Sequence, residues 1–424
     1  MNKICFITLG CPRNTVDTEV IAEILKKGSY SFTPHISAAD IVLINTCSFI
    51  KSAEKESLNM ISKISELKKD GKPNEIIVVG CLVERYKNNL KNLLKDVDDF
   101  YGVEKFSEIA SHFNVKGNFK NYKRTFSSFG HFAYIKVSEG CDSHCSYCTV
   151  PAIRGEYRSR CPEDIIKEAK SLASNGVKEL ILVAEDTASY GKDLNNGLNL
   201  GYLIKNLNKI ERVKWIRVMY LHPAQLSDKI LNDIVYSDKV CKYLDIPLQH
   251  ISDRILKSMR RRISKKEIIN LIEKIRFKMP ETALRTTFIV GYPDETEKDF
   301  CELYEFVKSI EFDRVGVFTY SREKGTDAYK LKNHIPEKVK RERQKEIMLL
   351  QKRISLEKNR ELIGKKLNVL VDLCDDEKGI SIGRTEKDAP EIDNLVIINN
   401  KIKSGSFVEV KIKDAKEYDI FGEL

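Results

Sequence analysis

Alternating apolar and polar segments along the first 115 residues predict a parallel α/β domain. Three short apolar runs have the pattern of buried strands, at residues 4–10, 41–46 and 75–80, and helical patterns follow the first two. Strands that alternate with helices in this way form a parallel sheet with helices on its faces. We therefore expect an N-terminal domain over residues 1–115.

The same alternation resumes after a polar, basic segment. Residues 114–126 contain Lys116, Lys120, Lys123 and Arg124, and we interpret them as a linker. Six candidate strands follow, at residues 133–138, 179–184, 215–220, 243–248, 284–290 and 314–320. Six βα units are fewer than the eight that close a complete barrel. The pattern thus predicts a partial, TIM-like (βα)6 barrel within a domain at residues 127–358.

The C-terminal part of the chain changes to short β-type runs. A long charged helix is expected from Pro336 to about Ile363, and five short runs separated by Gly, Asn and Asp come after it. Regular short strands of this kind predict a small five-stranded β-barrel of the OB type. The expected fold class is therefore α/β, with this small barrel as a third domain at residues 360–424.

Composition restricts the class of protein further. No apolar run is long enough to cross a membrane, and the N-terminus lacks the pattern of a secretory signal, so we expect a cytoplasmic protein. The net charge of +10 favours an acidic partner such as nucleic acid or the ribosome. Eleven cysteines in a long chain of a reducing compartment indicate metal binding or chemistry rather than disulfides.

Three cysteines lie close together directly after the first strand of the predicted barrel. Cys141, Cys145 and Cys148 have the spacing Cys-x3-Cys-x2-Cys, at the strand end where barrels place their active sites. Three thiolates can hold three corners of a 4Fe-4S cluster, whose fourth iron is then open to a ligand. An open iron can bind the amino and carboxylate groups of S-adenosylmethionine and start radical chemistry.

Two other interpretations of this motif are a zinc site, with His144 as a fourth ligand, and plain buried cysteines. Zinc sites usually contain two Cys pairs, and the chain has no second Cys-x2-Cys pair. Three cysteines within eight residues are also unusual as core filler. The spacing favours the iron–sulfur cluster.

A second set of cysteines ends the three N-terminal strands. Cys11, Cys47 and Cys81 each follow one strand directly. Because the carboxyl ends of parallel strands meet at one edge of a sheet, these three thiols are expected to converge. Buried structural cysteines would be the alternative, but three at equivalent positions favour a second cluster with an open iron.

These features resemble the methylthiotransferase family of radical S-adenosylmethionine enzymes over essentially the whole chain, with Tyr147 before the last cysteine of the motif. The resemblance implies an auxiliary 4Fe-4S cluster on Cys11, Cys47 and Cys81 and a radical cluster on Cys141, Cys145 and Cys148. It also implies that the C-terminal barrel is a TRAM domain, which helps to bind the substrate. Two molecules of S-adenosylmethionine are consumed in that family, one as methyl donor and one as radical source.

The family modifies either transfer RNA or an aspartate of a small-subunit ribosomal protein, the twelfth in the usual naming. Several segments are similar to the second branch, named RimO: residues 9–19, 185–191, 245–256, 318–328 and 388–393. The segment GYPDET at 291–296 departs from the usual pattern at Tyr292 and Asp294. These segments favour an aspartate β-carbon of the ribosomal protein, free or within its subunit, as the target.

The charge of the C-terminal barrel is a separate indication of the substrate. Residues 362–424 contain ten Lys and Arg against thirteen Asp and Glu, a net charge of −3, so the rest of the chain carries +13. A barrel that grips RNA phosphates should be basic, whereas an acidic barrel suits a basic ribosomal protein. Transfer RNA stays the alternative substrate, and a zinc protein that binds RNA without catalysis is the alternative from another class.

Four further residues are candidates for contact with S-adenosylmethionine. Tyr147 could pack near the adenine, and Glu185 and Arg217 lie near the carboxyl ends of the second and third barrel strands, where they could hold the amino and carboxylate groups. Gly291 ends the fifth barrel strand, where its backbone could approach the adenine. A surface aromatic, barrel salt bridges and a turn glycine are the structural alternatives. No catalytic acid or base is identified. The chemistry also requires an electron donor such as flavodoxin or ferredoxin and a source of sulfur.

Overall fold

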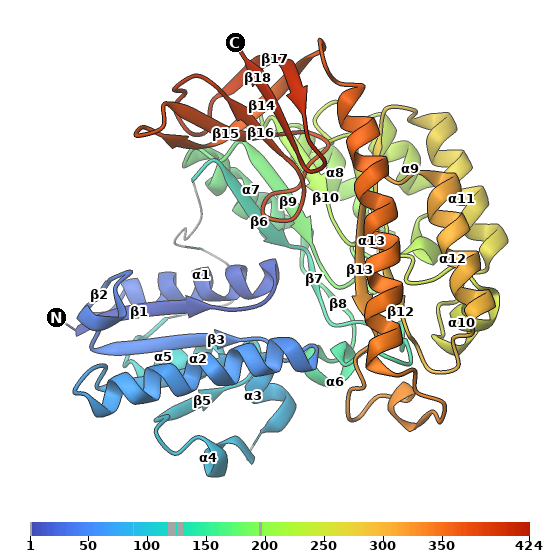
Figure 1. Cartoon of the computed structure of the whole chain (residues 1–424). Coiled ribbons are helices and arrows are strands. Elements are labelled where there is room, and N and C mark those ends of the chain that lie inside the picture. The colour runs from blue at the N-terminus through green and yellow to red at the C-terminus, as the bar shows by residue number, and fades with distance from the viewer. Residues whose placement is uncertain (1, 88, 118–123, 125–129, 195–196) are drawn as a thin grey trace.

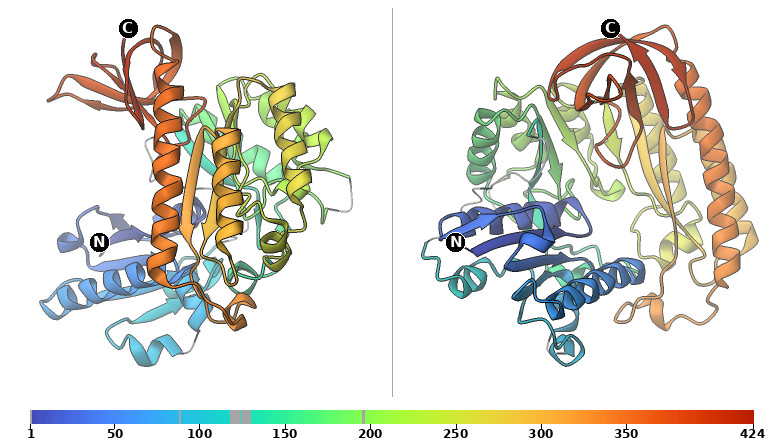
Figure 2. Two further views of the ribbon diagram at one scale, coloured as in Figure 1. Left: turned by 45° about the vertical axis from the view of Figure 1, so that its right-hand side comes forward. Right: turned by 60° about the vertical axis from the view of Figure 1, so that its left-hand side comes forward.

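The structure of the protein is a computed structural model of the whole chain, in which residues 2–87, 89–117, 124, 130–194 and 197–424 are described (Figure 1). Two α/β units and a small barrel make up the molecule. Figures 1 and 2 show the N-terminal unit beside one end of the central strands and the small barrel at their other end. No helix among the described residues is long and apolar enough to span a membrane.

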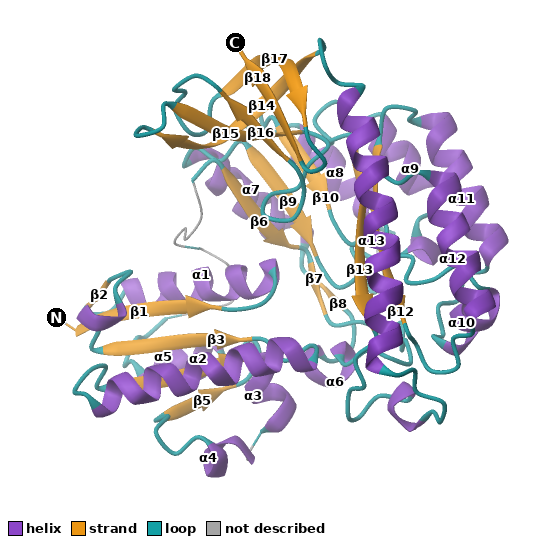
Figure 3. Ribbon diagram, viewed as in Figure 1, coloured by secondary structure: helices purple, strands orange, loops and turns teal. Residues whose placement is uncertain are grey.

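The N-terminal unit is a five-stranded parallel sheet with helices on both faces (Figure 3). Its strand order is β2-β1-β3-β4-β5. Helices α1 and α5 bury apolar side chains on one face and α2 on the other. The strands are β1 (Asn2–Thr8), β2 (Tyr30–Phe32), β3 (Ile41–Thr46), β4 (Glu75–Gly80) and β5 (Asp99–Tyr101). The helices are α1 (Pro12–Lys26), η1 (Ile36–Ala38), α2 (Lys51–Lys69), α3 (Cys81–Tyr86), α4 (Asn89–Leu93) and α5 (Phe106–His112).

Six parallel strands form the central unit, and the predicted partial barrel is confirmed. The sheets β6-β9-β10 and β11-β12-β13 meet through a bridge between Ile216 and Val240, and no pairing joins β6 to β13 among the described residues. The barrel is therefore open on one side. Its strands are β6 (Phe132–Lys136), β9 (Glu179–Val183), β10 (Trp215–Val218), β11 (Tyr243–Asp245), β12 (Ala283–Val290) and β13 (Arg314–Thr319).

Helices between the barrel strands cover the outside of the barrel and share one apolar core with them. They are α7 (Pro162–Ser174), α8 (Leu200–Asn208), α9 (Asp228–Val235), α10 (Asp253–Ser258), α11 (Lys265–Lys278), α12 (Glu297–Ile310) and α13 (Glu337–Arg360). Short elements in the loops are β7 (Ser138–Glu139), α6 (Val150–Arg154), β8 (Arg158–Ser159), η2 (Pro223–Gln225) and η3 (Ala328–Lys330). The predicted long helix after Pro336 is α13.

The C-terminal unit is the expected small five-stranded barrel, closed in the order β14-β15-β16-β18-β17. It packs against the N-terminal ends of the central strands, where the rings of Trp215 and Phe407 meet edge to face at 4.8 Å. Its strands are β14 (Lys366–Asp375), β15 (Ile380–Thr385), β16 (Leu395–Ile398), β17 (Phe407–Ala415) and β18 (Asp419–Glu423).

An acidic loop of the C-terminal barrel inserts into that end of the central barrel. Asp388 forms an ion pair with Arg314 at 2.5 Å, and Asp393 accepts a hydrogen bond from the hydroxyl of Tyr243 at 2.8 Å. Glu391 accepts a hydrogen bond from Tyr134 at 3.2 Å. Because these acidic side chains are bound within the protein, the net charge of −3 is a poor measure of what the barrel offers to a basic partner.

Most of the expected linker lies outside the described residues, but Arg124 is described and differs from the expectation. Its guanidinium is buried and forms ion pairs at 2.8 Å with Glu19 of α1 and with Glu168 of α7. Arg124 therefore fastens the N-terminal unit to the central barrel rather than lying in solvent.

Candidate metal centres at the domain junction

The loop between β7 and α6 carries three cysteines, Cys141, Cys145 and Cys148. Backbone amides point at two of the sulfurs: Ser143 donates to Sγ of Cys141 at 3.4 Å, and Val150 donates to Sγ of Cys148 at 3.5 Å. The amide of Cys148 donates in turn to the carbonyl of Cys145 at 3.0 Å. Amides that donate to sulfur stabilise thiolates, which are the form that binds iron.

A buried arginine completes the surroundings of this trio. Arg261 donates to Sγ of Cys145 at 3.7 Å and to the carbonyl of Pro247 at 2.5 Å. Burial, together with the negative charges that Cys145 and Cys141 would carry, raises the pKa of Cys148 to about 12. Thiols that oppose one another's ionisation in this way fit a site whose metal supplies the compensating positive charge.

The other three cysteines come together at the carboxyl edge of the N-terminal sheet. Thr46 and Gly80 are paired across β3 and β4, so Cys47 and Cys81 leave the sheet at the same level. A Cβ atom on Gly10 would lie 2.6 Å from Cβ of Cys47, which places the residue before Cys11 against Cys47. The predicted convergence of three strand ends is thus present in the structure.

The charge that each of these sulfurs would carry affects the pKa of its neighbours. Burial, together with the charges that Cys81 and Cys11 would carry, raises the pKa of Cys47 to about 11. Burial also opposes ionisation of Cys11, but the positive charges of Arg13 and Arg154 outweigh it and lower that pKa. A cluster of thiols beside fixed cations is suited to an anionic iron–sulfur group. Both trios therefore fit 4Fe-4S clusters with one iron left open.

The N-terminal unit lies against the carboxyl end of the central barrel at several points. Thr149, next to Cys148, donates to the carbonyl of Phe49 at 3.0 Å. A cavity of about 240 Å³ lies at this junction, lined by Phe49 from the N-terminal unit and by Tyr147, Ile289 and Tyr320 from the barrel. The two cysteine trios and this cavity therefore belong to one junction.

Comparison with known proteins identifies the family. Residues 3–102 match the model of an uncharacterized protein family, UPF0004, residues 135–307 match the radical SAM superfamily, and residues 363–424 match the TRAM domain. A protein of Lachnoclostridium phytofermentans is 42% identical over 99% of both chains. One of Aquifex aeolicus is 44% identical over 99% of this chain and 96% of that one. Both are named ribosomal protein uS12 methylthiotransferase RimO.

The chain belongs to the RimO family. Solved structures of other radical enzymes share its fold. The methyltransferase TsrM from Kitasatospora setae superposes with a TM-score of 0.56 at 11% identity, over 75% of this chain and 73% of that one. The cobalamin-dependent enzyme OxsB gives 0.51 at 13% identity, over 78% of this chain and 54% of that one. At these identities the likeness concerns the fold alone.

Two of the four S-adenosylmethionine candidates of this RimO-family chain lie at the junction. Tyr147 is adjacent to Cys148, lines the cavity and packs against the buried apolar cluster that includes Tyr292 and Tyr320. Glu185 follows β9 and forms an ion pair with Arg13, two residues after Cys11. Burial raises the pKa of Glu185 to about 7, although Arg13 acts in the opposite direction. Their contacts with S-adenosylmethionine stay predictions.

Arg217 is not brought to the cysteines. Its guanidinium donates at 2.8 Å to Glu179 and to the carbonyl of Glu386, and it stacks over the ring of Tyr243. These partners lie at the N-terminal end of the strands and in the loop of the TRAM domain. The structural alternative, a salt-bridged barrel residue, describes the observed contacts, and a role for Arg217 in holding S-adenosylmethionine gains no support from them.

Gly291 directly follows β12 and has a positive φ of 72°, which favours glycine. Its amide donates to Glu295 at 2.7 Å, and a Cβ atom there would lie 2.2 Å from Cγ of Lys340 on α13. The glycine is therefore required for close packing of α13. Its approach to the adenine stays a prediction.

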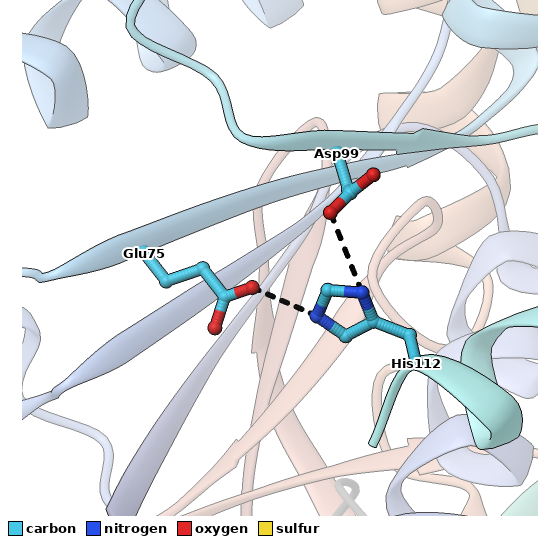
Figure 4. Close-up of side chains that lie close together, drawn as sticks. All are labelled: Glu75, Asp99 and His112. Atoms are coloured by element: carbon cyan, nitrogen blue, oxygen red, sulfur yellow. Dashed lines mark hydrogen bonds and ion pairs between the residues drawn. The ribbon is translucent and has the colours of Figure 1, made fainter. Parts of the chain in front are cut away.

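One other cluster in the described residues has a composition that could suit a metal. His112 lies between two carboxylates, with Nε2 2.7 Å from Glu75 and Nδ1 3.3 Å from Asp99 (Figure 4). Glu75 begins β4, so this group lies at the opposite end of the strand from Cys81. It ties α5 to the edge of the sheet and is separate from the cysteine sites.

Three charged residues near the cysteines were not identified from the sequence as part of the site. Arg13, Arg154 and Arg261 all contact or influence a cysteine of one trio. Arg13 and Arg154 follow a motif cysteine by two and six residues, so proximity to the motifs was the one available signal. Arg261 belongs to a basic run between two helices and carries no such signal.

Proposed function

We propose that this protein replaces a hydrogen on the β-carbon of an aspartate in ribosomal protein uS12 with a methylthio group. Relatives that are 42–44% identical over nearly the whole chain carry the name of this activity. The observation that carries the proposal is the meeting of two three-cysteine sites, each from a different unit, at one junction. Sulfur insertion at an unactivated C–H bond needs both a radical source and a sulfur carrier in reach of each other.

The cysteines divide between the two roles. The domain that we assign to residues 1–115 holds an auxiliary 4Fe-4S cluster through Cys11, Cys47 and Cys81. The domain at residues 127–358 holds the radical cluster through Cys141, Cys145 and Cys148, and a TRAM domain occupies residues 360–424. When bound, the clusters and S-adenosylmethionine supply sulfur, a methyl group and a carbon radical that removes hydrogen.

The protein itself contributes positioning and exclusion of water. Phe49 and Tyr147 line the small cavity from the two units, and we assign the bound target to the space between them. Restricting the reacting atoms to one enclosed place raises the rate of their encounter and limits quenching of a radical by solvent. Tyr147, Glu185 and Gly291 are the residues we assign to the cofactor side of this junction.

Two partners besides the ribosomal protein are required by the chemistry. A reduced electron carrier such as flavodoxin or ferredoxin must supply the electron for cleavage of S-adenosylmethionine, and a sulfur source must replace the sulfur that leaves with each product. The substrate is the ribosomal protein, either as a free protein or as part of the small ribosomal subunit.

A parallel substrate assay tests the proposal. The anaerobically reconstituted protein is incubated with S-adenosylmethionine, a reductant and either uS12 or unmodified transfer RNA, and both products are analysed by mass spectrometry. We expect a methylthio group on one aspartate of uS12 alone. Modification of the RNA alone would assign the protein to transfer-RNA maturation, and stoichiometric zinc without iron would exclude the radical chemistry.

Cys47→Ala separates the two cluster roles. We expect iron to fall from about eight to about four atoms per chain, with cleavage of S-adenosylmethionine retained and methylthiolation abolished. Cys5→Ala is the matched control, because Cys5 is a buried cysteine of β1 inside the apolar core. Iron analysis and product assays measure both variants. Methylthiolation at the wild-type level by Cys47→Ala contradicts the assignment.

A further inference from the structure

A five-residue helix joins the two cysteine trios. Helix α6 (Val150–Arg154) begins beside Cys148, whose Sγ accepts the amide of Val150, and ends at Arg154. The carbonyl of the next residue, Gly155, accepts the amide of Cys141 at 3.2 Å. At 1.5 Å per residue the helix spans about 7.5 Å. Its two ends are therefore both fixed to the radical-cluster loop.

The side chain of Arg154 reaches from this helix into the N-terminal unit. Nη2 donates to Sγ of Cys81 at 3.3 Å and to Oδ1 of Asn14 at 2.7 Å. Nη1 donates to Asp17 at 3.2 Å and to Glu139 at 2.9 Å. Arg154 is 5% exposed. A planar guanidinium with four partners has a single orientation, which fixes the distance from α6 to Cys81.

Asn14 connects Arg154 to the other two cysteine positions. Its amide nitrogen donates to the carbonyl of Leu9 at 2.7 Å and to that of Thr46 at 3.1 Å, near the ends of β1 and β3. Those donations leave its oxygen to accept the hydrogen bond from Nη2 of Arg154. The guanidinium is thereby tied to the framework that carries Cys11 and Cys47, as well as to Cys81 itself.

Counter-charges keep Arg154 in the buried junction. Asp17 and Glu139 each also pair with Lys136, at 2.7 and 2.6 Å. A buried cation is tolerated where anions and hydrogen bonds compensate it. The hydrogen bond to Cys81 is thus made by a buried cation that is held in one position.

We propose that Arg154 is a positioning residue that fixes the two cysteine trios relative to each other and raises the reduction potential of a cluster held by Cys11, Cys47 and Cys81. The inference rests on the proposed function for the presence of that cluster. A hydrogen bond and a positive charge at a ligand sulfur favour the reduced, more negative state of an iron–sulfur group. The same contact holds the sulfur carrier at the distance at which the radical site can use it.

The test compares Arg154→Met, which removes the charge at similar length, with Arg154→Lys and the control Arg158→Met. Arg158 lies on the same loop, but its side chain is 56% exposed and pairs with Glu104 at the surface. Redox titrations of the reconstituted full-length protein, followed by electron paramagnetic resonance, give the potential of the auxiliary cluster. Iron content, cleavage of S-adenosylmethionine and methylthiolated product are measured on the same samples.

We expect Arg154→Met to keep about eight iron atoms, to shift the auxiliary potential to a more negative value, and to lose methylthiolation about 10-fold or more. Arg154→Lys should restore part of the potential but less of the product, because a lysine cannot make the four contacts. Arg158→Met should match the wild type. If Arg154→Met does not bind its iron–sulfur clusters, the auxiliary potential and the product yield of Arg154→Lys decide whether the proposal holds.

An unchanged auxiliary potential in Arg154→Met, or wild-type potential and product in Arg154→Lys, overturns the proposal. An equal loss in Arg158→Met overturns it too, since the effect would then belong to the loop. The potential is measured without substrate. The auxiliary potential could shift in Arg154→Met while the wild-type protein modifies neither uS12 nor RNA. That result would contradict the proposed function and leave the role of Arg154 standing.

Discussion

Glycine precedes one or more cysteines of each trio, and each of these glycines has a conformation that side chains rarely adopt. Gly10, Gly80 and Gly140 have φ values of 93°, 93° and 76°. A Cβ atom on Gly80 would lie 2.3 Å from Oδ1 of Asn45, and one on Gly140 would lie 2.1 Å from the carbonyl oxygen of Glu156. The chain can turn its cysteines toward a common centre because these positions carry no side chain.

Gly140→Ala should damage the radical cluster more than its backbone strain alone predicts. A positive φ costs about 1–2 kcal/mol for alanine, and the clash with the backbone of Glu156 adds to that cost and displaces Cys141. We expect a lower melting temperature and loss of roughly half the bound iron, since the auxiliary trio is left intact. Calorimetry and iron analysis measure the two effects.

Gly176→Ala is the control for strain without a clash. Gly176 has a φ of 98°, and its nearest neighbour would lie 4.0 Å from the added Cβ. It should lose stability but retain its iron. Equal iron loss in the two variants would show that the cysteine loop does not depend on the space at Gly140.

Single elements explain how far the sequence could predict this structure. The strands Ile41–Thr46 and Glu75–Gly80 and the barrel strands β6, β9, β10 and β11 were found because they are apolar runs buried on both faces. The barrel strands β12 and β13 are partly exposed and were found because they are longer apolar runs. The edge strands Tyr30–Phe32 and Asp99–Tyr101 were missed, since three half-exposed residues carry no periodic signal.

The residues of the candidate site also divide into those that could be predicted from the sequence and those that could not. The cysteines could be placed because each follows a strand or stands in a spaced motif. The role of Arg154 could not, since its partners Asn14 and Cys81 lie 140 and 73 residues away in the chain. Contacts of that kind exist only after the two units have docked.

The acidic loop of the TRAM domain is an element whose contribution to stability can be measured. Asp388→Ala leaves the buried guanidinium of Arg314 without its carboxylate, and breaking a buried pair from one side costs about 3–5 kcal/mol. We expect a clear fall in the free energy of unfolding in urea. Asp376→Ala is the control, because that side chain is 83% exposed and lies 3.8 Å from Lys401. Equal stability of the two variants would contradict a structural role for the loop.

At the scale of the whole molecule, ion pairs connect the N-terminal unit to the central barrel at separate points. Arg13 pairs with Glu185, Arg124 with Glu168, and Arg85 with Glu323 at 2.7 Å. Glu323 also accepts the amide of Lys51 at 2.8 Å, at the first residue of α2. Together these contacts hold the sulfur-carrying unit at a set position on the barrel.

Glu323→Gln should uncouple the two halves of the reaction. Without its charge the contact with Arg85 weakens, and a small displacement of reacting groups can lower a rate as much as about 100-fold. We expect cleavage of S-adenosylmethionine to continue while methylthiolated product falls, so that the ratio of 5′-deoxyadenosine to product rises. Both compounds can be measured by liquid chromatography in one reaction.

Glu305→Gln provides the comparison, since Glu305 is 67% exposed and lies 3.7 Å from Lys308 on the surface of α12. Its ratio should equal that of the wild type. A wild-type ratio in Glu323→Gln would mean that the fastening by Arg85 does not govern the chemistry.

A sulfur-carrying unit that is held in place cannot move between a site where sulfur is supplied and the site of the substrate. Arg13, Arg85, Arg124 and Arg154 all hold the N-terminal unit against the barrel, so its three thiols are held at the junction of the two units. The substrates must then come to the N-terminal unit. We infer that S-adenosylmethionine and the target aspartate come in turn to this fixed position, so that the N-terminal unit does not need to move between steps.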